Sequence, residues 1–152
     1  MTDRDDMVGL VEVGPTTSRG PAVARSDMVG LVEGWVQRYL RAWDSNDPAD
    51  IRALLAPEAA YRFSPWEEPY VGHDAVTAAW LDHRDEAGDH EFTWEVVAID
   101  GDVAVVQGRT VYTAGPTAGK DYRNLWVIRL AEDGTAVEFT EWYTERASGT
   151  TG

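Results

Sequence analysis

The alternation of apolar and polar residues is clearest over residues 121–145, where it predicts two long antiparallel strands. The pair Asp133-Gly134 lies between the two runs, and Asp-Gly at such a place is a strong signal for a tight hairpin turn. Successive side chains of a strand point to opposite faces of the sheet. One face of the first strand carries Tyr122, Asn124, Trp126 and Ile128, and one face of the second carries Phe139, Glu141 and Tyr143.

Glu141 lies in the run Phe-Thr-Glu-Trp-Tyr, an unusual setting for a carboxylate. If its side chain faced outward, it would be a solvated charge on the sheet. If it faced inward, it would be an acid among aromatic rings, where the loss of water raises the pKa of a carboxyl group and suits it to proton transfer. The direction of this side chain therefore decides what Glu141 can do.

Helical spacing of apolar residues predicts three helices, and shorter apolar runs predict three further strands. The second helix is short, with Asp47 as N-cap, Pro48 in the first position and Pro57 at its end. The helices are expected over about 26–45, 47–57 and 73–86, and the strands over 59–64, 91–100 and 103–113. This order predicts an α+β fold, in which a curved antiparallel or mixed sheet wraps round three N-terminal helices to form a cone.

The two ends of the chain differ in character from the predicted cone domain over residues 27–146. Residues 1–26 contain several turn-forming pairs and are expected to form a flexible arm, while the Gly- and Thr-rich residues 147–152 are expected to fray. The heptapeptide Asp6–Glu12 recurs identically at Asp27–Glu33. Either the first copy is a duplicated segment within a loose arm, or it docks on a partner subunit where the second copy normally packs.

Composition narrows the classes of partner. The 152 residues have a net charge of −14, which argues against nucleic acid and anionic membranes as partners because both need a basic surface. No run approaches the length of a membrane span, and the acidic N-terminus does not resemble a signal peptide. The absence of cysteine excludes disulfides and thiolate chemistry and is consistent with a cytoplasmic location.

The predicted order of elements resembles the nuclear-transport-factor-2-like superfamily, which includes ketosteroid isomerases, SnoaL-like cyclases and limonene-epoxide-hydrolase-like enzymes. The resemblance covers about residues 33–143. It rests on short pieces of sequence at the expected places in the chain. These pieces are Val36–Tyr39, Asn46-Asp47, Ile51–Leu55, Pro69 with Gly72, and the turns Asp100-Gly101 and Asp133-Gly134.

The resemblance implies which side chains face the inside of the cone. It turns Val105, Gln107, Arg109 and Val111 inward, together with the face of the hairpin that carries Asn124 and Glu141. Aromatic residues are expected to wall the cavity, and a few polar groups converging in an apolar pocket are typical of a small-molecule site. The expected ligand-binding residues are Asn124, Gln107, Trp126, Trp80, Tyr61, Phe63, Trp66, Tyr122, Phe139, Tyr143 and Trp43.

The catalytic residues that the resemblance implies are Glu141, Arg109 and Tyr39. The carboxylate base of ketosteroid isomerases is not matched, since Phe63 and Ser64 stand at its place, but the hydrogen-bonding tyrosine is matched by Tyr39. Arg109 matches the arginine that epoxide-hydrolase-like members carry on the middle strand. In SnoaL-like enzymes an acid–base residue lies inside the cone, and Glu141 is the candidate for it. Alternatively, Glu141 and Arg109 form a buried structural ion pair.

Three functions are therefore open. The first is an enzyme without cofactor or metal, a cyclase, isomerase or hydrolase acting on a small apolar or aromatic molecule. The second is a ligand-binding domain without catalysis. The third is a dimerisation domain, since the outward side chains Leu125, Val127 and Trp142 are apolar enough to pack against a second copy. A homodimer through the outer sheet face is compatible with each of the other two.

Overall fold

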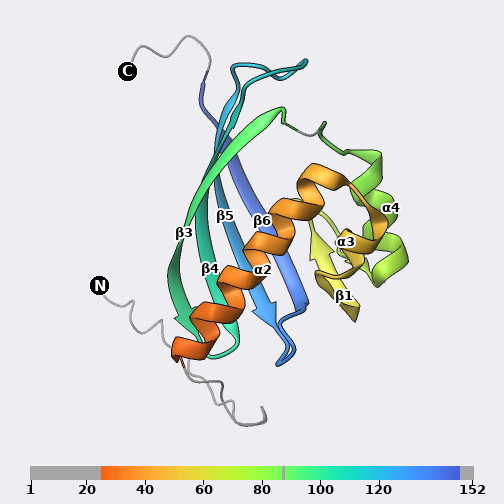
Figure 1. The fold of residues 1–152 in the computed structure, drawn as a ribbon, viewed down its shortest axis with the longest axis vertical. Helices are drawn as coiled ribbons and strands as arrows, with labels where there is room; N and C mark the ends of the chain where they lie inside the picture. Colours follow the sequence, from red (N-terminus) through yellow and green to blue (C-terminus); the bar gives the residue numbers. More distant parts are fainter. Residues whose placement is uncertain (1–24, 87, 148–152) are drawn as a thin grey trace.

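The computed structural model describes residues 25–86 and 88–147 and shows three helices and a six-stranded sheet over them (Figure 1). The helices are α2 (Arg25–Ser45), α3 (Pro48–Arg52) and α4 (His73–Asp82). The strands are β1 (Leu55–Arg62), β2 (Tyr70–Val71), β3 (His90–Asp100), β4 (Val103–Tyr112), β5 (Asp121–Leu130) and β6 (Ala136–Glu145). The predicted arm up to residue 24, with the first heptapeptide, and residues 148–152 lie outside the described residues.

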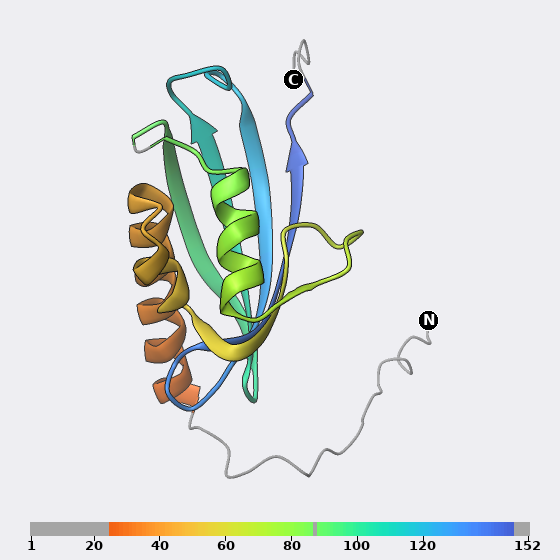
Figure 2. The same cartoon turned by 90° about the vertical axis from the view of Figure 1, so that its right-hand side faces the viewer.

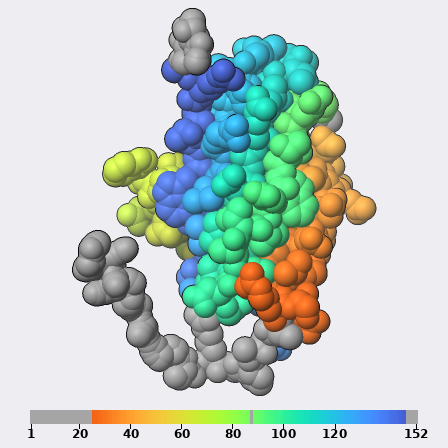
Figure 3. Space-filling model, turned by 90° about the vertical axis from the view of Figure 1, so that its left-hand side faces the viewer, coloured from red at the N-terminus to blue at the C-terminus, as the bar shows by residue number. Residues whose placement is uncertain are grey.

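The sheet is mixed, in the order β2-β1-β6-β5-β4-β3. Strands β3 to β6 form an antiparallel meander, whereas β1 pairs parallel to β6 and antiparallel to β2. The helices lie on one side of this curved sheet (Figure 2), and the opposite face of the meander is at the surface (Figure 3). The α+β class and the sheet wrapped round three helices are thus confirmed.

The longest helix, α2, forms where the sequence places apolar residues three and four positions apart. Its side chains Met28, Val32, Trp35, Val36 and Tyr39 are buried against the sheet. Trp35 is fully buried and donates from its Nε1 to the backbone oxygen of Leu54, 2.9 Å away. This hydrogen bond holds α2 at the start of β1. Further along α2, Trp43 packs on His90 and Phe92 of β3.

Two predicted boundaries are wrong for identifiable reasons. Helix α3 has the expected cap, with Asp47 accepting from the backbone N–H of Ala49, but it ends at Arg52 and β1 begins at Leu55. Pro57 lies within β1, in the irregular stretch of its pairing with β6, where its missing N–H leaves no gap in the ladder. Helix α4 ends at Asp82 instead of residue 86, so the polar residues 83–86 belong to a loop.

The inward register is as predicted on β5 and β6 and wrong on β4. Tyr122 to Trp126 and Phe139 to Tyr143 present the expected faces to the helices. On β4, however, the buried positions are Ala104, Val106, Gly108 and Thr110, while Gln107 and Arg109 are exposed on the outer face. Gly108 is required there because an added Cβ would lie 2.6 Å from Cε1 of Phe92, whose ring crosses this position.

Candidate functional site

A cavity of about 280 Å³ opens between the helices and the inner face of the sheet. Its walls come from α2, the end of β1, α4 with the loop after it, and strands β4, β5 and β6. The lining residues are Tyr39, Trp43, Phe63, Trp80, His83, Arg84, Asp85, Thr110, Tyr112, Tyr122, Asn124, Glu141 and Tyr143. Seven of these are aromatic, so the cavity is an aromatic box with a small number of polar groups.

Glu141 faces into this cavity from β6 and is held by a short chain of hydrogen bonds. Thr110 donates from Oγ1 to Oδ1 of Asn124 at 2.8 Å, and Asn124 donates from Nδ2 to Oε2 of Glu141 at 2.7 Å. Thr110 and Asn124 are buried. An ionised carboxylate only accepts hydrogen bonds, so Asn124 presents its NH2 group to Glu141 and its Oδ1 to the Thr110 hydroxyl. These two hydrogen bonds set the orientation of the Glu141 carboxyl group.

Burial raises the pKa of Glu141 from 4.5 to about 7. The loss of water is the largest cause, and the hydrogen bond from Asn124 lowers the pKa against it. Trp126 also lowers it, although its buried Nε1 makes no well-formed hydrogen bond. Asp85 adds a like charge that raises it. A carboxyl group with this pKa is able to give or take a proton near neutral pH.

Two buried tyrosines, one on α2 and one on β1, are affected by the charge of Glu141. Tyr39 lines the cavity, and its ring packs 4.4 Å from that of Trp126, centroid to centroid. Burial raises the pKa of both Tyr39 and Tyr61 well above 10, with the charge of Glu141 contributing in the same direction. Both hydroxyls therefore stay protonated at neutral pH and can donate hydrogen bonds.

Asp85, in the loop after α4, was not expected at the site. Its Oδ2 accepts from Nε1 of Trp43 at 2.9 Å and from the hydroxyl of Tyr112 at 3.0 Å, which joins α2, this loop and the end of β4 across the cavity mouth. In the sequence Asp85 is one of several charges in a polar run. Only the fold brings it to Trp43 and Tyr112, so no local pattern points to it.

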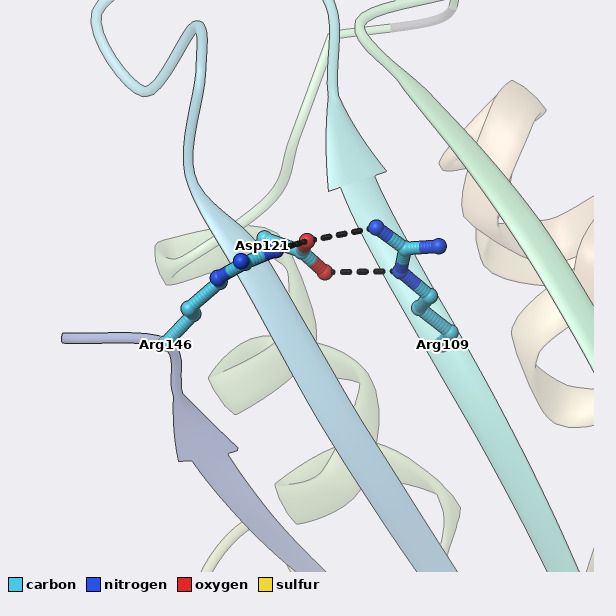
Figure 4. Close-up of polar contacts among 3 residues, drawn as sticks. All are labelled: Arg109, Asp121 and Arg146. Carbon is cyan, nitrogen blue, oxygen red and sulfur yellow. Dashed lines mark hydrogen bonds and ion pairs between the residues drawn. The ribbon is translucent and has the colours of Figure 1, made fainter. Parts of the chain in front are cut away.

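Arg109 lies outside the cavity, contrary to the prediction. Its Nε and Nη2 donate to Oδ1 and Oδ2 of Asp121 at 2.9 and 2.6 Å, and Arg146 lies 3.7 Å from the same carboxylate (Figure 4). On the outer face the guanidinium keeps its water and gains a two-pronged partner, whereas beside Glu141 it would lose most of its hydration. Arg109 and Glu141 thus point to opposite faces of the sheet and form no pair.

The other predicted residues divide into three groups. Those that line the cavity are Asn124, Trp80, Phe63, Tyr122, Tyr143 and Trp43. Tyr61, Trp126 and Phe139 are 0–1 % exposed and form the core beneath Glu141 without lining the cavity. Gln107 and Trp66 point away from it, since Gln107 shares the outer face with Arg109 and Trp66 is 95 % exposed in the loop after β1.

Within residues 25–86 and 88–147, no group of three or more His, Asp and Glu side chains is arranged to hold a metal ion. None of the helices in this part of the chain is both long and apolar enough to cross a membrane. The only charged side chains in the cavity lining are Glu141 and Asp85 with His83 and Arg84, and the last two are exposed at the mouth.

The chain is similar to known proteins in sequence and in fold. The family model for the SnoaL-like domain matches residues 36–139. Among curated proteins, none matches.

Solved structures share the fold at low identity. A nuclear-transport-factor-2-like protein of unknown function from Burkholderia xenovorans is 12 % identical, with a TM-score of 0.61 over 85 % of this chain and 92 % of that one. A protein from Kribbella flavida, provisionally described as a ketosteroid isomerase, is 17 % identical, with a TM-score of 0.59 over 82 % and 85 %. A protein of unknown function from Mesorhizobium loti is 20 % identical, with a TM-score of 0.55 over 78 % and 94 %.

Proposed function

Because the chain belongs to the SnoaL-like domain family, whose model spans most of the described cone, we propose that its cavity binds a small, largely apolar or aromatic molecule and that Glu141 moves a proton to or from it. One observation carries this proposal. A carboxyl group with a pKa of about 7 stands in an aromatic cavity, in an orientation fixed by Asn124. Neither a solvated surface charge nor a buried ion pair has these properties.

Glu141 would act as a general base in its ionised form and as a general acid in its protonated form. With a pKa near the ambient pH both forms are present, which is the condition under which one group can take a proton and return it. The Tyr39 hydroxyl, which stays protonated, would donate a hydrogen bond to an oxygen on which negative charge develops. A cyclase, isomerase or hydrolase of this kind would use no cofactor, and Arg109 would take no part.

Proton abstraction can be tested without the natural substrate. We expect the chain to catalyse exchange of the α-hydrogens of 2-tetralone, a small aromatic ketone, with solvent deuterium. Glu141→Gln keeps the size of the side chain and removes the base, so it should slow exchange by about 100-fold or more. The measurement is loss of the α-proton signal by NMR at pH 8, with the folded state of each variant checked by circular dichroism.

Arg109→Gln is the matched control, because it removes a charge from β4 on the outer face of the sheet, away from the cavity. It should leave the exchange rate within about twofold of the original chain. Equal rates for the original chain and Glu141→Gln would contradict the acid–base role.

A binding function without turnover is favoured by one feature, the pairing of polar groups within the protein. Thr110 with Asn124, and Asp85 with Trp43 and Tyr112, already satisfy one another. If the ketone binds but does not exchange its protons, the cavity belongs to a ligand-binding domain, and Glu141 serves recognition instead of catalysis.

A further inference from the structure

Several hydrogen-bond donors in the cavity lining are used by the protein itself. Thr110 donates to Asn124, and Asn124 donates to Glu141. The indole of Trp80 also donates inside the protein, from Nε1 to Oδ1 of Asn46 at 3.0 Å. A ligand that needs to accept hydrogen bonds would find these groups already engaged.

Two further donors near the mouth are engaged by Asp85. Trp43 and Tyr112 each direct their single N–H or O–H at this carboxylate, and neither has a second proton to offer. Among the described residues, Asn124 supplies the one well-formed hydrogen bond to Glu141, and it reaches Oε2. Because a carboxylate can accept about four hydrogen bonds, Glu141 has spare acceptor capacity that faces the cavity.

The charged residues of the cavity lining also favour a ligand with positive charge. Glu141 and Asp85 are the two acids of the lining, and the like charge of Asp85 raises the pKa of Glu141. The two basic residues of the lining, His83 and Arg84, are exposed at the mouth, and neither contributes to the pKa shift of Glu141. The ionised form of Glu141 therefore has no basic side chain of the described lining paired with it.

Aromatic rings surround this charge. Tyr39, Trp43, Phe63, Trp80 and Tyr122 are among the seven that line the cavity. The faces of aromatic rings attract cations, by up to about 2 kcal/mol where water is excluded. Rings and carboxylates in one enclosure form an environment that recognises an organic cation.

We propose that the ligand of this cavity is a small amine, bound as its ammonium cation, with the nitrogen facing Glu141 and an apolar or aromatic body among the rings. This inference rests on the proposed function in assuming that the cavity holds a small molecule, and it adds the chemical class. The amine supplies a positive charge beside Glu141 and an N–H donor for the acceptor sites of this carboxylate that no described residue fills.

The experiment compares ligands of one shape that differ in charge. N,N-dimethylbenzylammonium and isobutylbenzene have the same arrangement of heavy atoms, but only the first carries a charge and an N–H. Binding to the whole chain is measured through quenching of tryptophan fluorescence. We expect the cation to bind at least about tenfold more tightly than the hydrocarbon.

Two variants test whether the ammonium nitrogen lies beside Glu141 or beside Asp85, and a third variant is the control. Glu141→Gln should remove most of the preference for the cation, whereas Asp85→Asn should reduce it less. Arg109→Gln, on the outer face, should leave it unchanged. Loss of the preference on Arg109→Gln, or its survival in Glu141→Gln, would overturn the assignment.

The pH dependence adds a second readout, for which benzyltrimethylammonium is used because it has no proton to lose. Asp85 from the loop raises the pKa of Glu141, and Glu141 in turn raises the pKa of Tyr39 from α2, Tyr61 from β1 and Tyr112 from β4. His83 and Arg84 from the same loop, Tyr122 from β5 and Tyr143 from β6 also line the cavity. The tyrosines stay protonated, so Glu141 governs this range. The cation binds its ionised form, so affinity should fall about tenfold from pH 8 to pH 6 and stay flat in Glu141→Gln.

The outcomes separate the two proposals. If the hydrocarbon binds as tightly as the cation, the amine is excluded while the cavity remains a binding site. If neither ligand binds and 2-tetralone shows no catalysed exchange, the proposed function fails as well.

Discussion

At the scale of single residues, the carboxyl group of Glu141 is subject to opposing influences. Removal from water favours its protonated form, and the hydrogen bond from Asn124 favours its ionised form. The first influence is larger, so the folded chain holds a proton that the unfolded chain has released between pH 4.5 and about 7. The site thus carries a cost in stability that grows with pH.

The pH dependence of stability should reveal this cost. Where the folded state binds more protons than the unfolded state, stability falls as pH rises, so the contribution of Glu141 worsens from about pH 4.5 to pH 7 and then levels off. Over that range the free energy of unfolding of Glu141→Gln should gain about 3 kcal/mol relative to the original chain. Urea unfolding at several pH values measures the difference, and a constant difference would show that the pKa is not raised.

The polar groups of the hairpin could be located from the sequence, whereas Asp85 could not, because its place at the cavity depends on contacts with distant residues. Asn124 and Glu141 were placed correctly because β5 and β6 alternate clearly. Arg109 was misplaced because Val103 to Val106 are apolar on both faces, which hides the register of β4. Gly108 was the better signal for the inward face of β4. Where an aromatic ring packs directly on a strand, the position beneath the ring has no room for a side chain.

At the scale of elements, β3 and β4 are joined to the core beneath the cavity by one close approach. The ring of Phe92 on β3 lies over Gly108 and stacks on Trp126 of β5, with centroids 5.1 Å apart and planes 15° from parallel. Trp126 in turn contacts Tyr39 of α2. The absence of a side chain at residue 108 therefore lets three strands and a helix join beneath Glu141.

Gly108→Ala tests this arrangement. The added methyl group would overlap the Phe92 ring, so the strands must separate or the ring must turn, and we expect a loss of about 1–3 kcal/mol in the free energy of unfolding. Gly30→Ala is the control, because nothing lies within 4 Å of its Cβ on the exposed side of α2. There alanine should stabilise the helix by up to about 1 kcal/mol. Equal effects of the two changes in urea unfolding would contradict the packing role of Gly108.

The order of elements was predictable, whereas some of their ends were not. Asp47 and Pro48 start α3 as their chemistry dictates, but Leu55 was counted as helical because an apolar residue suits either element. The two-residue strand β2 carries no periodic signal and was not expected. This strand pairs with β1 and forms one edge of the sheet. The pairing depends on the fold of the loop between the two strands.

At the scale of the whole molecule, the outer sheet face offers an apolar surface between charged groups. Leu125 and Trp142 lie directly opposite each other on β5 and β6 and are 36 % and 42 % exposed. A shallow groove of about 380 Å³ runs beside them, lined also by Gln107, Arg123 and Thr144. We propose that this face packs against a second copy of the chain.

Light scattering coupled to gel filtration tests the dimer. The original chain should have twice the mass of a single chain, and Trp142→Glu should give the mass of one chain because a charge would be buried at the contact. Trp66→Glu places the same charge on a more exposed tryptophan away from the sheet, and it should stay dimeric. A single-chain mass for the original protein would rule out the dimer at the concentration used.

The parallel pairing of β1 with β6 has a consequence for how the molecule comes into being. Among the described strands, β6, which carries Glu141, is synthesised last, and its neighbour β1 is synthesised first. Until β6 inserts between β1 and β5, the early helices have no complete sheet to cover, and contacts so distant in sequence slow the search for the native state. During synthesis the exposed edges of β1 and β5 would be able to pair with other chains, so insertion of β6 completes the sheet and also protects the molecule from aggregation.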